Sequence, residues 1–147
     1  MIELKGDFWM EAENDYDAIV CTINTRLRKD GTLVMGAGIA KEFAENFLYL
    51  PDTWGRRTKE MLKTCPFVEL REHPCLVGLH TKYDWKDDSP LHLIDRSLKQ
   101  LHVVAQSLNW TRILMTKPGC GHGGRSWGDE VKPLFDKFDH RYYVIDN

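Results

Sequence analysis

Short apolar runs alternate with segments of helical periodicity along this chain, and that alternation constrains its fold more than any other feature. Runs apolar enough to form strands occupy residues 1–4, 18–24, 67–72, 76–82, 112–116 and 142–145. These runs lack a regular polar–apolar alternation, which is typical of strands covered on both faces of a sheet. The order of elements therefore predicts an α/β domain of three layers, with a mixed six-stranded sheet between two layers of helices.

Two helices are expected in the first half of the chain. Ile39, Phe43 and Phe47 recur at intervals of four residues, so they would form one apolar stripe along a helix. A second helix is expected to begin near Asp52. Its apolar positions would be Trp54, Met61, Leu62 and Cys65.

The two helices of the second half have clearer start signals. Ser89 is a candidate N-cap, and Pro90 fits the first helical turn because its missing N–H leaves no hydrogen bond unmade there. The apolar face of this helix would carry Leu91, Ile94, Leu98, Leu101 and Ala105. Ser126 is expected to cap the last helix through Asp129. The buried side of that helix would hold Val131, Leu134, Phe135 and Phe138.

Length and charge limit the classes of function that fit. The 147 residues suit one domain, residues 1–147, and 20 basic against 22 acidic residues give a net charge of −2. This balance excludes a broad attraction to polyanions or to membrane surfaces. No apolar run approaches the roughly 18 residues that a membrane-spanning helix needs, and the acidic N-terminus does not resemble a signal peptide. We expect a monomer without membrane contact.

The four cysteines are far apart and form no CxxC pair. Their spacing favours reduced thiols in the cytoplasm over a disulfide framework. Cys120 and His122 lie close together, but no second pair of ligands at zinc spacing accompanies them. We therefore expect no metal ion, and we expect no cofactor.

Glycines cluster at two junctions between a predicted strand and a predicted helix. The first glycine loop, residues 35–40, contains Met35, Gly36, Gly38, Ile39 and Ala40. The second glycine loop, residues 119–124, contains Gly119, Cys120, Gly121, His122, Gly123 and Gly124, and Pro118 directly before it is a further candidate for ligand binding. Glycine lets the backbone approach a ligand closely, and a helix N-terminus adds free N–H donors and about half a positive charge. Two such junctions facing one cleft would hold a diphosphate. The alternative is that the glycines only form tight turns.

Two common phosphate-binding motifs do not fit this sequence. The pattern GxxxxGK[ST] is absent, which excludes a P-loop. The stretch GAGIAK matches half of the dinucleotide-binding fingerprint. However, eleven residues separate Asn24 from Gly36, whereas that fingerprint needs a tight turn directly after the strand.

The stretches CTINT, VMGAGIAKEF, LHTKYDW and PGCGHGGRSWGDEVKPLF, in this order and spacing, resemble the macrodomain family. The similarity runs from KGDFW near the start to YYVI near the end, so it covers nearly the whole chain. It is strongest to the branch that holds terminal ADP-ribose glycohydrolase and the antitoxin DarG. The resemblance implies ADP-ribose as the ligand, either free or attached to a protein or to DNA.

The resemblance also assigns roles to single residues. Asp7 and Phe8 stand where the family recognises adenine, and Tyr143, beside Tyr142, would stack on the base. Asn24 stands near the distal ribose, and the two glycine loops would hold the phosphates. Plainer alternatives remain open: Asp7 as a turn residue, Asn24 as a strand-end cap, and the tyrosines as ordinary strand residues.

Lys82 decides between an enzyme and a binding protein. Its place in TKYDW matches the lysine of the hydrolase branch, which the resemblance sets beside the distal ribose. A partly desolvated amine there could attack an opened sugar aldehyde or assist departure at the anomeric carbon. The alternative is a solvated lysine at the end of a strand.

The sequence departs from the family pattern around Lys82. Gly123 and Ser126 stand at two positions where relatives carry an aspartate, and Asp84 or Asp129 could substitute. Residues 26–33, RLRKDGTL, are an insertion whose basic residues are Arg26, Arg28 and Lys29. This segment is either a solvated loop or a contact to the nucleic acid or acidic protein that bears the ADP-ribose.

Three functions are compatible with these residues. The first is a glycohydrolase that removes ADP-ribose from a protein side chain or a nucleic-acid base by means of Lys82. The second is a non-catalytic binder of ADP-ribose or of a related nucleotide derived from NAD, which the missing aspartates favour. The third is a phosphatase acting on ADP-ribose phosphate, in which His122 could take part.

Overall fold

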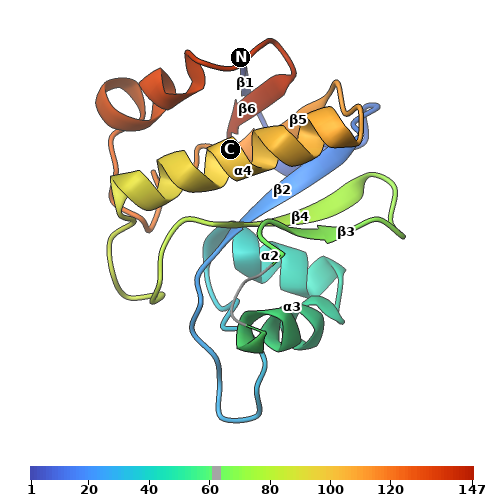
Figure 1. Ribbon diagram of the computed structural model, residues 1–147, viewed down its shortest axis with the longest axis vertical. Helices are drawn as coiled ribbons and strands as arrows, with labels where there is room; N and C mark the ends of the chain where they lie inside the picture. The colour runs from blue at the N-terminus through green and yellow to red at the C-terminus, as the bar shows by residue number, and fades with distance from the viewer. Residues whose placement is uncertain (61–63) are drawn as a thin grey trace.

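The computed structural model has the expected three-layer α/β architecture (Figure 1). It describes residues 1–60 and 64–147. The strands are β1 (Ile2–Lys5), β2 (Ala18–Ile23), β3 (Phe67–Glu69), β4 (Cys75–His80), β5 (Ile113–Thr116) and β6 (Tyr142–Asp146). They form one sheet in the order β1-β6-β5-β2-β4-β3, in which only the β3–β4 pair is antiparallel. The mixed six-stranded sheet is confirmed.

Helices cover both faces of this sheet. On one face lie the short α1 (Phe8–Glu11), α2 (Gly38–Asn46) and α3 (Leu50–Lys59). On the other face lies α4 (Leu91–Ser107) with two short helical turns, η1 (Trp127–Val131) and η2 (Lys132–Phe135). Within the described part of the chain, no helix is long and apolar enough to cross a membrane.

The central strand β2 shows why the apolar runs are continuous. Ala18 and Val20 pack toward α4, whereas Ile19, Cys21 and Ile23 pack toward α2 and α3. Each of these side chains is nearly or fully buried. Burial of a large apolar side chain stabilises the fold by about 1.5–3 kcal/mol, and a strand between two helical layers gains this on both faces.

The predicted strands are all present, with ends that differ by up to three residues. β3 stops at Glu69 because the chain turns at Leu70, three residues before the predicted end. β4 ends at His80, which leaves Thr81 and Lys82 in the loop at its carboxyl end. The short helix α1 was not predicted, since four residues cannot show a helical period.

Two details of the predicted helices are wrong. α3 begins at Leu50, close to the expected Asp52, but it ends at Lys59, so Cys65 lies beyond it. Met61 and Leu62 fall outside the described residues. Ser89 does not cap α4: its hydroxyl is buried without a hydrogen-bond partner, and Pro90 takes the N-cap position. The Ser89 N–H donates to the carbonyl of Gly123 at 2.8 Å, and this bond holds Ser89 away from the N-cap position of α4.

The last predicted helix is not an α-helix. Ser126 does cap it, since its hydroxyl accepts from the Asp129 N–H at 3.4 Å. However, η1 is a π-helical turn and η2 a 3₁₀ turn. Pro133 stands in η2, and a proline has no N–H to continue an α-helical ladder. Val131 and Phe135 are buried as expected.

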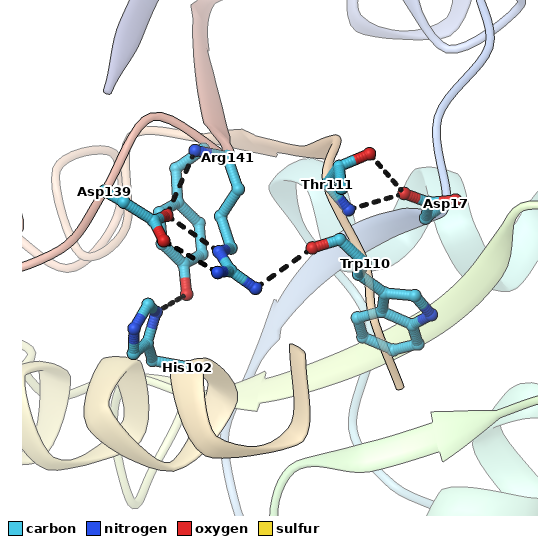
Figure 2. Close-up of polar contacts among 7 residues, drawn as sticks. Asp17, His102, Trp110, Thr111, Asp139 and Arg141 are labelled. Atoms are coloured by element: carbon cyan, nitrogen blue, oxygen red, sulfur yellow. Dashed lines mark hydrogen bonds and ion pairs between the residues drawn. The ribbon is translucent and has the colours of Figure 1, made fainter. Parts of the chain in front are cut away.

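Polar contacts fix the amino ends of β2, β5 and β6, as Figure 2 shows. Just before β2, the Asp17 carboxylate accepts from the Thr111 N–H at 2.7 Å. Just before β6, the Arg141 guanidinium donates to the Asp139 carboxylate at 2.7 Å and to the Trp110 carbonyl at 3.0 Å. The amino ends of these strands are therefore closed by contacts within the protein. The open loops lie at the carboxyl ends.

Candidate functional site

A cavity of about 920 Å³ opens at the carboxyl ends of β6, β5, β2 and β4, which are neighbours in the sheet. Ile145, Thr116 and Ile23 line it from β6, β5 and β2, and Thr81 lines it from the residue that follows β4. Because the strands are parallel, the loops that leave them converge at this edge. A cavity of this volume is typical of sites for small ligands.

The first glycine loop enters the cavity at the amino end of α2. Ala37 is the N-cap residue, and no side chain caps the helix there. The first N–H groups of an α-helix have no partner within the helix. Gly36, Gly38, Ile39 and Ala40 all line the cavity. Gly38 has a φ of +56°, a conformation that side chains disfavour. This end of α2 therefore presents free donors to an anion.

The second glycine loop has two sides. Gly119, Cys120, Gly121 and His122 line the cavity. Gly123 and Gly124 do not, because they pack against Ser89 and Asp88 in the segment that leads into α4, and the buried Pro118 does not line it either. A Cβ on Gly123 would stand 2.4 Å from the Ser89 hydroxyl and 2.5 Å from the Gly119 carbonyl oxygen. Close packing, not ligand contact, accounts for glycine at that position.

The two loops meet inside the cavity. A Cβ on Gly38 would lie 3.3 Å from Cδ2 of His122, so the two glycine loops are in van der Waals range of each other. About 80 residues separate the two loops along the chain, and the order of the strands in the sheet brings them together. Donors from both loops can therefore reach one diphosphate.

Lys82 lines the cavity beyond the second glycine loop. Its ammonium donates to the backbone carbonyl of Trp85 at 2.9 Å and to that of His122 at 3.4 Å. Neither substitute carboxylate pairs with it. Asp84 is 3.3 Å from Arg26 in an ion pair, and Asp129 lies in the capped turn of η1. Lys82 thus holds its position through carbonyl oxygens, which leave its charge uncompensated.

Asn24 also lines the cavity, but its amide is engaged by the backbone. Its side-chain nitrogen donates to the Val34 carbonyl at 3.1 Å, and its oxygen accepts from the Arg26 N–H at 2.8 Å. These bonds close the base of the inserted segment. Asn24 therefore caps the end of β2 and also faces the cavity.

The adenine residues predicted from the resemblance do not line this cavity. Phe8 is fully buried in the core, and the Asp7 carboxylate caps α1 by accepting from the Met10 N–H at 2.9 Å. Tyr143 lies at the other end of β6, where its hydroxyl accepts from Arg112 at 2.9 Å. Tyr142 is buried beside His102. Met35 is likewise a core residue, with 5% of its surface exposed.

Instead, three acceptors line the β6 end of the cavity: Glu42, Asp146 and Asn147. Asp146 pairs with Lys117 at 3.3 Å, and Asn147 accepts from the Phe8 N–H through its side-chain oxygen at 2.8 Å. Phe8 therefore influences this end through Asn147. Sequence reasoning missed Glu42 because it stands on the polar side of α2, where a solvated glutamate is the ordinary expectation.

Two further lining residues lay within motifs that had been noted for other reasons. Trp85 belongs to the TKYDW stretch, in which only Lys82 had been singled out; 57% of its surface is exposed at the mouth of the cavity. Arg28 belongs to the insertion, for which a solvated loop and a contact to the carrier were both left open. The Asp30–Gly31 pair was the available signal, since Asp-Gly is typical of a hairpin turn that would fold the insertion back.

Cys120 and His122 both line the cavity. Burial raises the pKa of the Cys120 thiol to about 11, so the thiol is protonated near neutral pH. Its sulfur donates to the Pro118 carbonyl at 3.4 Å. Across residues 1–60 and 64–147, no group of three or more His, Cys, Asp or Glu side chains is placed to hold a metal ion.

His80 ends β4 immediately before Thr81 and Lys82, and only 3% of it is exposed. Burial and the nearby Arg96 lower its pKa to about 4, from a usual value near 6.5. The unfolded chain binds this proton more readily than the folded protein, so the contribution of a neutral His80 to stability is lost as pH falls below about 6.5.

We expect the free energy of unfolding to fall by about 2 kcal/mol more between pH 7 and pH 5 in the wild type than in His80→Gln. Urea unfolding followed by tryptophan fluorescence at both pH values measures the difference. Equal pH dependence in the two proteins would contradict a buried neutral imidazole.

The fold was compared with solved structures. The macrodomain of Thermus aquaticus DarG matches at a TM-score of 0.78 and 22% identity, over 98% of this chain and 95% of that one. The macrodomain of Mycobacterium tuberculosis DarG matches at 0.78 and 27% identity, over 99% and 96%. Thermosipho africanus DarTG in complex with ADP-ribose matches at 0.78 and 18% identity, over 99% of this chain and 41% of that one. No family model and no curated protein sequence matches the chain.

An α/β/α sandwich with a mixed sheet and a cavity at the carboxyl ends of its strands, matched over nearly its whole length by these structures, has the macrodomain fold. Within that fold, the chain is similar to the DarG macrodomains. The resemblance carried by the sequence motifs is thereby confirmed.

Proposed function

We propose that this protein binds ADP-ribose in the cavity and removes it from a macromolecular carrier by means of Lys82. The observation that carries the ligand assignment is the meeting of the two glycine loops at the uncapped amino end of α2. A DarTG protein of the same fold has been solved with ADP-ribose, which supports the same ligand here.

The order of chemical groups along the cavity suits this ligand. Acceptors at the β6 end, such as Asp146 and Asn147, would take the exocyclic amine of adenine. The N–H donors of the glycine loops, in the middle, would take the diphosphate. Lys82 and Asn24, at the β4 end, would stand beside the distal ribose. In this proposal Phe8 acts through Asn147, which accepts from its N–H, and Asp7 acts by capping α1, the helix that begins at Phe8.

The catalytic part of the proposal rests on Lys82. Its amine reaches the cavity, and backbone carbonyls hold it in place without neutralising it. An amine there can attack the opened sugar or assist departure of the carrier, whether that is a protein side chain or a nucleic-acid base. The exposed cations Arg28 and Lys86 at the mouth would favour an anionic carrier.

A second candidate is a binding protein without turnover. It is favoured by one specific observation, which is that Asp84 and Asp129 are both engaged away from Lys82. Neither of these two aspartates is then placed to assist the lysine. Binding of ADP-ribose without release from any ADP-ribosylated protein or DNA would establish this candidate.

Calorimetry with ADP-ribose, AMP and NAD tests the ligand. We expect one ADP-ribose per chain, bound at least about tenfold more tightly than AMP, because AMP lacks the second phosphate and the distal ribose. Gly36→Val should weaken this binding, since Gly36 is exposed in the cavity and only Arg28 lies within 4 Å of its Cβ position. Gly128→Val is the matched control, because a Cβ there meets nothing within 4 Å outside the cavity. A wild-type protein that does not bind ADP-ribose would end the proposal.

A further inference from the structure

The inserted segment forms a closed hairpin, residues 26–34. Leu27 and Leu33 form an antiparallel bridge, and the Arg28 N–H donates to the Thr32 carbonyl at 2.8 Å. The Asp30 carboxylate closes the turn by accepting from the N–H and the hydroxyl of Thr32, at 3.0 and 2.7 Å. The insertion is thus an ordered element with its own hydrogen bonds.

This hairpin is docked on α3. Leu33 is fully buried, and its N–H donates to the Pro51 carbonyl at 2.8 Å. A Cβ on Gly55 of α3 would lie 2.2 Å from the Gly31 carbonyl oxygen, so the backbones are in direct contact there. A residue carried by this hairpin is therefore held in a defined place relative to the cavity.

The three basic residues of the hairpin have different environments. Arg26 is paired with Asp84 at 3.3 Å. Lys29 is exposed and does not line the cavity. Arg28 lines the cavity, with one guanidinium nitrogen 3.7 Å from the Cβ position of Gly36. Among the hydrogen bonds and ion pairs of the described residues, none involves the Arg28 side chain. Its charge stands over the first glycine loop without a partner.

We propose that Arg28 is a specificity-determining residue that binds the phosphate lying on the first glycine loop. The guanidinium offers several N–H donors in a planar fork, which matches two oxygens of one phosphate. In this arrangement the N–H donors at the amino end of α2 bind one side of the phosphate, and the guanidinium of Arg28 binds the other side. The inference rests on the proposed function for the identity of ADP-ribose, but it requires only a diphosphate in the cavity.

Arg28 should therefore affect ligands that carry phosphate and leave nucleosides unaffected. We expect Arg28→Ala to bind ADP-ribose about tenfold more weakly than the wild type, with adenosine affinity unchanged. Arg28→Lys keeps the charge without the fork, so it should lie between the two. Lys29→Ala is the matched control, because it removes an adjacent charge that does not face the cavity, and it should bind within twofold of the wild type.

The measurements are calorimetry with ADP-ribose and NMR titrations with adenosine and with inorganic pyrophosphate, following the Gly36 amide. If Arg28→Ala binds ADP-ribose within twofold of the wild type, this inference is overturned and the proposed function is not affected. An equal loss for adenosine would also overturn it, since Arg28 would then act through the shape of the hairpin. If the wild type binds pyrophosphate through Arg28 but not ADP-ribose, the inference stands and the proposed function fails. Binding of neither ligand would end both.

Discussion

Replacing Lys82 with alanine is expected to lower the release of ADP-ribose from an ADP-ribosylated carrier by at least about 100-fold. The affinity for free ADP-ribose should stay within about threefold of the wild type, because the glycine loops and the β6 end of the cavity are unchanged. The amine is the group that would react with the distal ribose, and truncation to alanine removes it. Single-turnover release from modified protein and from modified DNA measures the first quantity, and calorimetry measures the second.

Lys82 also links two loops, so a structural role has to be separated from a chemical one. Its ammonium joins the Trp85 and His122 carbonyls. Lys82→Arg can retain a cation between these carbonyls but supplies no nucleophilic amine, so it should keep affinity and stability without restoring turnover. Lys41→Ala is the control, since Lys41 is 61% exposed on α2 and does not line the cavity. Undiminished turnover in Lys82→Ala would remove the lysine from the mechanism. A parallel loss of affinity and turnover would make it a link between loops only.

Gly123→Ala is expected to lower the free energy of unfolding by about 3 kcal/mol. The added Cβ would stand 2.4 Å from the Ser89 hydroxyl, 2.5 Å from the Gly119 oxygen and 2.8 Å from the Gly119 carbonyl carbon. Two of these atoms belong to the backbone of the same loop, so the loop itself must move. Since that loop lines the cavity, ADP-ribose binding should fall together with stability.

Gly121→Ala is the matched variant in the same loop, because a Cβ there meets nothing within 4 Å. Its unfolding free energy should lie within about 0.5 kcal/mol of the wild type. Urea unfolding followed by tryptophan fluorescence compares the two variants. Equal stabilities would mean that the second glycine loop is not packed as described.

Most of the fold could be predicted from the sequence because both helical layers leave a periodic trace. The stripe of Ile39, Phe43 and Phe47 located α2, and the apolar runs located all six strands. Predictions failed where tertiary contacts overrode a local signal. Ser89 is an acceptable N-cap by residue type, yet its N–H is bound by Gly123 and its hydroxyl is buried. Pro133 turned the last predicted helix into a π turn and a 3₁₀ turn.

The candidate site was predictable in its glycine loops and less so elsewhere. Gly36, Gly38, Gly119 and Gly121 line the cavity. Their place at strand–helix junctions was the signal, because glycine there lets the backbone approach a ligand closely. Tyr143 was expected near the base from its place in the last strand, but that expectation did not account for how far along β6 it stands. It lies at the amino end, two residues before Ile145, which does reach the cavity.

The sequence by itself determined the layers of this protein and the positions of its two glycine loops along the chain. It also singled out Lys82, which lies between the two loops in the sequence. Those properties follow from local periodicity and from the backbone freedom of glycine, which need no partner across the fold. Only the tertiary structure decided which residues share the cavity. The strand order sets the carboxyl ends of β6, β5, β2 and β4 side by side, and the docking of the hairpin on Gly55 carries Arg28 over Gly36. Both depend on contacts between residues distant in sequence, which local patterns do not encode.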